Sequence, residues 1–355
     1  MNNLDLTPTP TAADETDGND NPVSNDVSTA LGALILGLVF LLGVPGNLFI
    51  VWSILARIRQ RSVTTILILN LACADGFLMA LTIFFVIYLA MRSWVFGQVM
   101  CKGVFYLCNS NMYASIFLIT LMSVHRLVAV VFPSRLSSLV SRKIVRRVIV
   151  CMWLLVMVFS VPSLVFRDVI KNTHRSECVP HHSWSRYVKF QYAFETVVGF
   201  ILPYTVIIIS YVLILKRLRQ TKFHRKMCSE KLILAIVVMS GLFRLPYHVV
   251  NMIQVAAESY PDNSITQTKL YQISQSSRAV TSALAFISSC ANPILYTIAG
   301  KSYIKQSGLA FMARLFEDQT ENKKSQIMGK DKVVTSNVDS ANSTGTPTIQ
   351  NVSRA

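Results

Sequence analysis

The sequence predicts an all-α membrane protein, a seven-transmembrane helix bundle followed by a short amphipathic C-terminal helix. Only 15% of the 355 residues are charged and 52% are hydrophobic, with a mean hydropathy of +0.46. A soluble domain carries about 25% charged residues. Cutting the chain at its charges leaves seven apolar stretches, and each is long enough to supply the roughly 20 residues that cross a bilayer.

Each of the seven stretches fits a membrane-spanning helix, because hydrocarbon offers no other partner to backbone N–H and C=O groups. Three stretches enclose a single charged residue, which is Asp75 in the second, Glu195 in the fifth and Arg244 in the sixth. In chain order, the residues that bound the stretches are Asp26 and Arg57, Arg61 and Arg92, Lys102 and His125, Arg147 and Arg167, Lys189 and Lys216, Lys231 and Glu258, and Arg278 and Lys301.

The distribution of basic residues predicts how the chain is oriented. The first 56 residues contain six acids and no Lys or Arg. With that segment outside, the three inner loops carry 16 Lys and Arg and the three outer loops carry nine, as the positive-inside rule requires. We therefore expect a multi-pass plasma-membrane protein with an extracellular N-terminus and a cytosolic C-terminus. The net charge of +16 then suits membrane lipids or an acidic cytosolic partner, and not nucleic acid.

The segments outside the bundle have a different composition. Residues 1–27 are rich in Asp, Asn, Thr and Pro, which predicts a disordered extracellular N-tail. The bundle is expected over residues 28–300. Residues 301–317 place apolar side chains on one helical face, which indicates an interfacial helix. Residues 318–355 are polar and contain many Ser and Thr, so we expect a disordered cytosolic tail open to phosphorylation.

Two of the seven cysteines fall on the expected outer side. Cys101 lies at the outer end of the third stretch and Cys178 lies in the second outer loop. That side is oxidising, so a disulfide between them is expected. The alternative is a pair of free thiols.

Each span carries a polar or helix-bending landmark. In chain order they are GVPGN ending at Asn47, LNLACAD ending at Asp75, Cys101 and SVHRLVAV from Ser123, Trp153, Pro203, FRLPY from Phe243, and NPILY from Asn292. This ordered set resembles the rhodopsin-like (class A) G-protein-coupled receptors. Within that class, MYASIFLIT, FETVVGFILPY, LPYHVVN, ALAFISSCANPILY and MARLFE resemble the leukotriene B4 receptors. The resemblance covers about Ser28 to Glu317.

The resemblance implies a G-protein-coupled receptor for a lipid mediator, leukotriene B4, which is an anionic, hydroxylated fatty acid. It implies signalling mainly through heterotrimeric G proteins of the inhibitory class, in leukocyte chemotaxis and inflammation. Arrestin and receptor kinases would act on the Ser- and Thr-containing tail. No enzyme is expected, because the chain shows no nucleophile–base constellation. No cofactor is expected either, apart from an allosteric sodium ion.

Two other readings compete with the lipid receptor. A class A receptor for a chemotactic peptide would use the acidic N-tail and the basic second outer loop, with Arg175, Arg186 and Lys189. A light-driven retinal protein would need a lysine in the seventh span for its Schiff base. Phe286 occupies that place, and residues 279–300 contain no lysine, which excludes this class.

The resemblance also implies a sodium site around the acid of the second span. Asp75 is accompanied by oxygen-bearing residues at the family positions that surround the ion, and oxygen ligands suit a hard cation. These residues are Asn47, Ser115, Ser289 and Asn292. The alternative is a cluster of interhelical hydrogen bonds without an ion.

Six residues are candidates for ligand binding, because ionisable and polar groups within membrane spans are functional candidates. They are Tyr113, Arg167, Glu195, His248, Asn251 and Arg278. The family carries ligand-contacting residues at four of these positions, all except His248 and Arg278. An arginine can take a carboxylate through two parallel hydrogen bonds, and the uncharged groups can meet hydroxyls. The alternatives are snorkelling for the arginines and interhelical hydrogen bonding for Tyr113, His248 and Asn251. Phe105 departs from a histidine of the family, which removes one expected hydroxyl contact.

A third set is expected to act in activation and G-protein coupling. It comprises His125, Arg126, Arg244, Pro246, Asn292, Pro293 and Tyr296. Two members depart from the class pattern: His125 replaces the usual acid before Arg126, and Arg244 replaces a tryptophan. An arginine at the centre of a membrane helix costs about 2.5–3.5 kcal/mol on insertion scales, so a carboxylate partner is expected. Asp75 and Glu195 are the two candidates.

Overall fold

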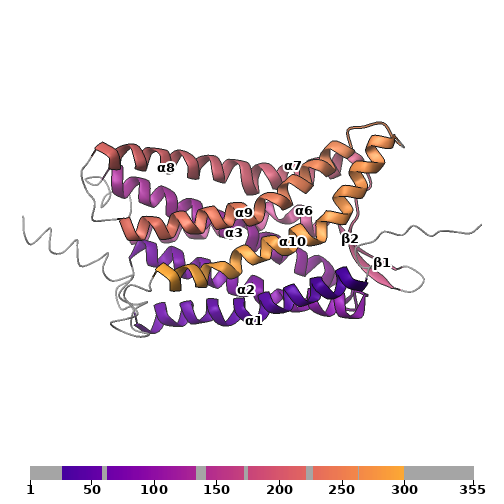
Figure 1. Ribbon diagram of the computed structural model, residues 1–355, viewed down its shortest axis with the longest axis horizontal. Coiled ribbons are helices and arrows are strands. Elements are labelled where there is room, and N and C mark those ends of the chain that lie inside the picture. Colours follow the sequence, from indigo (N-terminus) through magenta and orange to yellow (C-terminus); the bar gives the residue numbers. More distant parts are fainter. Residues whose placement is uncertain are drawn as a thin grey trace, which may run out of the picture.

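Seven long helical segments run alongside one another in the computed structural model (Figure 1). The structure describes residues 26–57, 62–132, 141–171, 175–220, 227–262 and 264–299. In chain order, the elements are helices α1 (Asp26–Arg57), α2 (Val63–Met91), α3 (Gly97–Val131), α5 (Arg142–Phe159) and α6 (Val161–Val165), strands β1 (Arg167–Lys171) and β2 (Ser176–Pro180), and helices α7 (Ser185–Thr196), η1 (Val197–Ile201), α8 (Leu202–Gln220), α9 (Met227–Ala257) and α10 (Ile265–Ala299).

Two of the seven segments are built from more than one element. The fourth consists of α5 and α6 and runs over Arg142–Val165. The fifth, over Ser185–Arg219, consists of α7 and α8 joined by the π-helical turn η1. Within the described residues, six segments are long and apolar enough to cross a membrane.

The seventh segment, α10, starts earlier than the charge pattern predicts. The apolar stretch begins at Arg278, but the helix already begins at Ile265. The first half of α10 is rich in Thr, Gln and Ser, so hydropathy does not detect it. As a result, Arg278 lies more than three turns inside a helix and bonds to a neighbouring one, and the helix extends well beyond the apolar stretch that Arg278 bounds.

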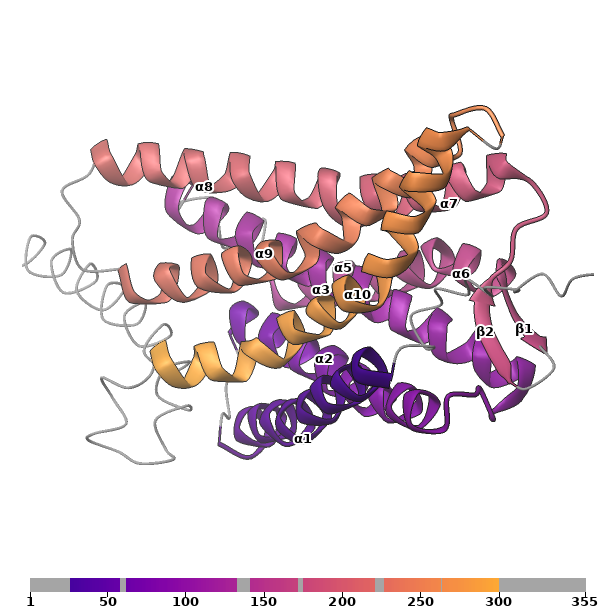
Figure 2. The ribbon, with the colours of Figure 1, turned by 45° about the vertical axis from the view of Figure 1, so that its right-hand side comes forward.

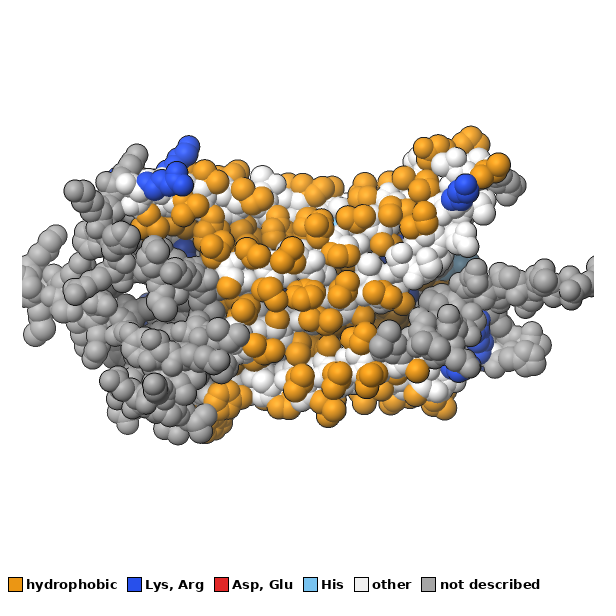
Figure 3. Space-filling model, viewed as in Figure 1, with side chains coloured by type: hydrophobic (Ala, Val, Ile, Leu, Met, Phe, Trp, Pro, Cys, Tyr) orange, Lys and Arg blue, Asp and Glu red, His pale blue; other side chains and the backbone are white. Residues whose placement is uncertain are grey.

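The surface of the bundle is apolar where the helices face outward. Figure 3 shows hydrophobic side chains over the middle of one face, with Lys and Arg only near its two ends. Leu41 on α1 and Leu154 on α5 are each 64% exposed, whereas Leu71 and Ile116 are fully buried between helices. Exposed apolar surface of this extent marks contact with lipid, so the fold is that of the predicted membrane bundle.

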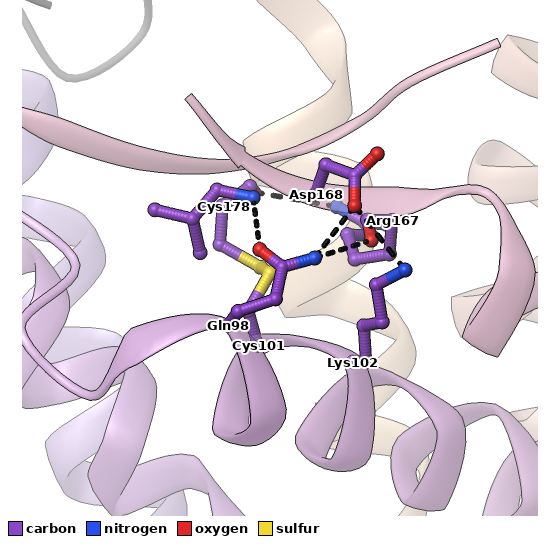
Figure 4. Close-up of polar contacts among 7 residues, drawn as sticks. Gln98, Cys101, Lys102, Arg167, Asp168 and Cys178 are labelled. Atoms are coloured by element: carbon purple, nitrogen blue, oxygen red, sulfur yellow. Dashed lines mark hydrogen bonds and ion pairs between the residues drawn. A yellow bond between two sulfur atoms is a disulfide. The ribbon is translucent and has the colours of Figure 1, made fainter. Parts of the chain in front are cut away.

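The antiparallel pair β1–β2 lies across one end of the bundle, which we call the hairpin end (Figure 1). A disulfide joins Cys178 on β2 to Cys101 on α3, which confirms the predicted bond. Gln98 on α3 adds a second attachment: its Nε2 donates to Asp168 at 2.6 Å, and its Oε1 accepts from the Val169 N–H at 2.7 Å (Figure 4).

An ion pair completes this attachment. Lys102 Nζ lies 3.2 Å from Asp168 Oδ1. Slight burial acts to raise the pKa of Asp168, but the hydrogen bonds from Lys102 and Gln98 outweigh it and hold the pKa below its usual range. The carboxylate therefore stays charged, and the hairpin stays fixed to α3, throughout the physiological pH range.

The N-tail predicted over 1–27 falls almost entirely outside the described residues. The interfacial helix at 301–317 and the cytosolic tail at 318–355 lie wholly outside them. These three segments, and the orientation of the chain in the membrane, stay predictions.

Candidate functional site

A buried carboxylate organises the polar groups in the half of the bundle nearest the hairpin. Glu195 on α7 is 3% exposed. It accepts hydrogen bonds from Gln191 Nε2 at 3.0 Å, from the Tyr247 hydroxyl at 3.0 Å and from Asn251 Nδ2 at 3.4 Å. Gln191 also meets the ring nitrogen Nε2 of His182 at 2.8 Å. We call Glu195, Gln191, Tyr247 and Asn251 the Glu195 network.

Arg278 on α10 continues this network across to the next helix. Figure 2 shows α9 and α10 side by side, and Arg278 Nη1 donates to Asn251 Oδ1 on α9 at 3.2 Å. The guanidinium carbon lies 4.6 Å from the centre of the Tyr192 ring. The other terminal nitrogen, Nη2, is buried and has no hydrogen-bond partner among the described residues. This donor is therefore available to a ligand as far as the described part of the chain is concerned.

Arg167 lies on β1, just past the end of α6, and its side chain is half-buried. Its guanidinium carbon is 3.6 Å from the centre of the Phe105 ring, and its Nη1 donates to the Cys178 carbonyl at 3.4 Å. Burial lowers the pKa of Arg167, Tyr192 partly opposes that shift, and the positive charge of Arg278 adds to it. The Glu195 carboxylate opposes the shift more strongly than Arg278 adds to it. Two guanidinium groups and one carboxylate still leave one positive charge in excess, which a further anion would offset.

Phe105 takes a role that the family comparison did not predict. The ring makes a cation–π contact that supports the Arg167 guanidinium; the predicted loss of a ligand hydroxyl contact stays a prediction. The same ring packs edge-on against Phe85, with centroids 5.2 Å apart.

A second group of polar side chains meets at the π-helical turn. A Cβ built on Gly199 would lie 3.1 Å from Tyr113 Cε1 and 3.6 Å from His248 Cε1. Four buried atoms of adjoining residues have no hydrogen-bond partner among the described residues. They are Tyr113 Oη, His248 Nδ1, His248 Nε2 and Thr196 Oγ1. We call Tyr113, Thr196, Gly199 and His248 the Gly199 cluster.

The Gly199 cluster has the chemistry of a site for a neutral polar group. A buried donor or acceptor without a partner costs roughly 1–3 kcal/mol, so the unpartnered atoms of these residues favour a ligand that can bond to them. A neutral imidazole and two hydroxyls can both donate and accept. That combination suits an alcohol group, which also does both.

The residues predicted to surround sodium come from α1, α2, α3 and α10. Asn292 Nδ2 donates to Asp75 Oδ2 at 2.6 Å, and Asn47 Nδ2 donates to the Gly43 carbonyl at 3.0 Å. All five predicted residues are buried, and four of their oxygens have no hydrogen-bond partner in the described part of the chain. These oxygens are Asn47 Oδ1, Asp75 Oδ1, Ser115 Oγ and Ser289 Oγ. One carboxylate with neutral oxygens fits a hard monovalent cation.

Arg244 on α9 does not form the predicted ion pair. It is 2% exposed, and its guanidinium donates to the Met112 carbonyl at 2.9 Å and to Ser288 Oγ at 3.3 Å. Among the described residues, no ion pair joins it to Asp75 or to Glu195. Two neutral acceptors from α3 and α10 take two of its N–H groups instead, so no ion pair cancels its positive charge within the described part of the chain. Asp75 is close enough to feel that charge.

The other residues predicted for activation are spread along the bundle. His125 and Arg126 lie in the last turns of α3, at the end opposite the hairpin. Pro246 lies inside α9 and Pro293 inside α10, where Pro293 packs against Gly46 of α1. Tyr296 belongs to α10, but its side chain lies outside the described part.

Sequence reasoning missed several members of these groups. The spacing of Gln191 and Glu195, four residues apart, would have revealed their contact on one helix face. Tyr247 stands within the FRLPY segment, but nothing in that segment indicates its bond to Glu195. No sequence pattern marks Thr196 and Gly199 as part of a site, because their position beside Tyr113 and His248 depends on the π-helical turn.

Comparison of the sequence with known proteins identifies the family to which it is similar. Residues 46–296 match the family described as 7 transmembrane receptor (rhodopsin family). The chain is 36% identical over 288 residues to leukotriene B4 receptor 1 of Homo sapiens, covering 81% of this chain and 82% of the relative. It is 36% identical over 310 residues to leukotriene B4 receptor 2 of Homo sapiens, covering 86% and 85%. A more distant relative is the type-1 angiotensin II receptor A of Xenopus laevis, 28% identical over 281 residues, covering 77% of this chain and 76% of the relative.

Proposed function

The chain belongs to the rhodopsin family of seven-transmembrane receptors, and from that premise we propose that its ligand is an anionic, hydroxylated fatty acid of the leukotriene B4 type. A receptor of this family is not an enzyme, and it acts through a ligand and a G protein. We propose coupling to the inhibitory class, in leukocyte chemotaxis and inflammation. We place the receptor in the plasma membrane with the hairpin end extracellular.

One observation carries the ligand assignment: the unpartnered donor of Arg278 lies in the same region as Arg167. Within the described residues, Glu195 is the carboxylate of this network, and it already accepts from three neutral donors. The two guanidinium groups exceed by one the single carboxylate, Glu195, that acts on Arg167, and each can bind a ligand carboxylate through parallel N–H groups.

The Gly199 cluster supports the hydroxylated part of the proposed ligand. Tyr113, His248 and Thr196 offer neutral donors and acceptors without partners. A saturated chain without a hydroxyl would leave those groups unsatisfied, so a hydroxylated lipid is favoured over a plain fatty acid.

The buried oxygens around Asp75 support an allosteric sodium ion, held by Asp75, Asn47, Ser115, Ser289 and Asn292. Such an ion would supply a positive charge between the helices that carry these residues. For the cytosolic tail we propose phosphorylation by receptor kinases and binding of arrestin.

A chemotactic peptide is the second candidate ligand. The exposed basic side chains of Lys171 and Arg186 near the hairpin favour it, because they would attract an acidic peptide. The discriminating experiment exposes cells that express the chain to a panel of eicosanoids and a panel of chemotactic peptides, with cyclic AMP as the readout. A response confined to hydroxylated eicosanoids supports the proposal, and a response confined to peptides overturns it.

A further inference from the structure

A second candidate binding surface lies far from the hairpin, in a groove between α3 and α5. The groove is open on one side and has a volume of about 500 Å³, comparable with the roughly 300–1,000 Å³ of small-molecule sites in proteins. One side is a stripe on α5 formed by Ile144, Arg147, Val148, Cys151 and Leu155. Their spacing puts them on one helix face.

The other side of the groove comes from α3, and the lining is apolar apart from one charge. Phe117 and Leu121 contribute apolar surface, and Met152 of α5 is buried at the floor. The hydroxyl of Thr120 already donates to the Ile116 carbonyl at 2.8 Å. Arg147 is therefore the single charged group that the groove offers to a ligand.

The charge of Arg147 has no acidic counterpart on the helices that form the groove. Neither α3 nor α5 contains an Asp or a Glu. Arg142, Lys143, Arg146 and Arg147 lie among the first six residues of α5, where their like charges repel one another. An anion at this position would compensate both unfavourable effects.

The direction of the groove matches a lipid that stands in one leaflet. Arg147 lies in the second turn of α5, at the end of the bundle opposite the hairpin, and Leu155 lies eight residues further into the span. Eight residues of helix correspond to ~12 Å, so the groove runs from the headgroup level into the hydrocarbon. Leu155 is 51% exposed and Val148 is 40% exposed, so the apolar side stays open to a chain that lies along it.

We propose that this groove binds one anionic phospholipid, with its phosphate on Arg147 and one acyl chain along α5 as far as Leu155. The lipid would be specific to the leaflet at that end of the bundle, which is the cytosolic one in the orientation proposed above. Anionic phospholipids are concentrated in that leaflet.

The test of the headgroup contact uses the purified full chain and native mass spectrometry. The probes are phosphatidylserine and phosphatidylcholine with identical acyl chains, without any agonist. Arg147→Gln is expected to weaken phosphatidylserine binding by about fivefold, which corresponds to ~1 kcal/mol per basic side chain at a membrane surface. The matched control Arg142→Gln removes the same charge from the same helix outside the groove lining and is expected to change binding less than twofold. Equal losses in the two variants, or equal binding of both lipids by the unmodified chain, would overturn the proposal.

A second pair of variants tests the acyl-chain contact. Leu155→Trp places an indole in the groove and is expected to reduce binding of phosphatidylserine at least threefold. Leu154→Trp adds the same ring at a neighbouring lipid-facing position that does not line the groove, and it should leave binding unchanged. Glycerophosphoserine, the headgroup without chains, should not displace the lipid. Displacement by it, or unchanged binding in Leu155→Trp, would show that no chain occupies the groove.

Discussion

Arg278 donates one hydrogen bond to Asn251 and keeps a second buried donor without a partner among the described residues. Its Nη1 lies 3.2 Å from Asn251 Oδ1, while Nη2 is buried and bonds to no described residue. Leaving a charged donor unsatisfied away from water is unfavourable. A ligand carboxylate would satisfy Nη2 without breaking the bond that positions Nη1, so in the proposed function Asn251 would orient Arg278 for the ligand.

The first prediction concerns Arg278. Arg278→Gln should weaken binding of a leukotriene B4-type free acid about 10- to 100-fold, because a hydrogen bond to a charged group contributes roughly 1.5–3 kcal/mol. Its methyl ester should lose less than threefold. Competition binding on membranes measures both. Lys269→Gln, on the same helix and exposed, is the control that should leave both ligands unaffected. Equal losses for acid and ester would show that Arg278 does not read the carboxylate.

The second prediction separates the charge of Arg167 from its support. Arg167→Gln should also weaken binding of the free acid more than binding of its methyl ester. Phe105→Leu keeps the charge but removes the ring that lies 3.6 Å from the guanidinium carbon, and we expect an intermediate loss for the acid. The same binding assay compares the two variants. If Phe105→Leu has no effect while Arg167→Gln does, the stacking contact does not position the arginine.

The third prediction tests the Gly199 cluster. Gly199→Ala adds a methyl group 3.1 Å from Tyr113 Cε1, which forces that ring to move. Overpacking of this kind costs about 1–3 kcal/mol, so a hydroxylated ligand should bind roughly tenfold or more weakly. An analogue without the hydroxyl should lose less. Gly103→Ala is the matched control, because its added Cβ meets nothing within 4 Å. An equal loss for both ligands would refute a hydroxyl-reading role.

The fourth prediction concerns the uncancelled charge of Arg244. It acts on Asp75 without pairing with it, so it should repel sodium from the neighbouring oxygens. We expect agonist affinity of the unmodified chain to change less than twofold when sodium replaces a bulky organic cation at fixed ionic strength. Arg244→Gln keeps a donor for the Met112 carbonyl and should raise the effect to at least fivefold. Adding Asp75→Asn should abolish it again. A strong sodium effect in the unmodified chain would contradict this account.

The bundle could be predicted because the requirement that produces it can be read from the order of charged and apolar residues along the chain. A backbone in hydrocarbon must form helices, and charge-free stretches mark where that requirement applies. The disulfide followed from the same reasoning, since Cys101 and Cys178 fall on one side. The start of α10 at Ile265 could not be predicted this way, because its polar first half is stabilised by packing against α9 rather than by lipid.

Many residues of the candidate site could be predicted from the sequence, but the hydrogen bonds that each of them forms could not. Arg244 was expected beside a carboxylate, yet it bonds to a backbone carbonyl and a serine hydroxyl. The sequence shows that a buried arginine needs acceptors, but any carbonyl can serve, and only tertiary structure brings Met112 within reach. Likewise, Gly199 gains its importance from the π-helical turn, which depends on how α7 and α8 join.

The measurement that tests the central claim most directly is the cyclic AMP response to leukotriene B4 in cells expressing the chain. The account predicts that nanomolar concentrations, corresponding to about −12 kcal/mol of binding free energy, lower cyclic AMP. A variant with both Arg167→Gln and Arg278→Gln, matched for surface expression, should respond only at concentrations at least a hundredfold higher. No response of the unmodified chain to leukotriene B4, together with a clear response to a peptide, would contradict the assignment.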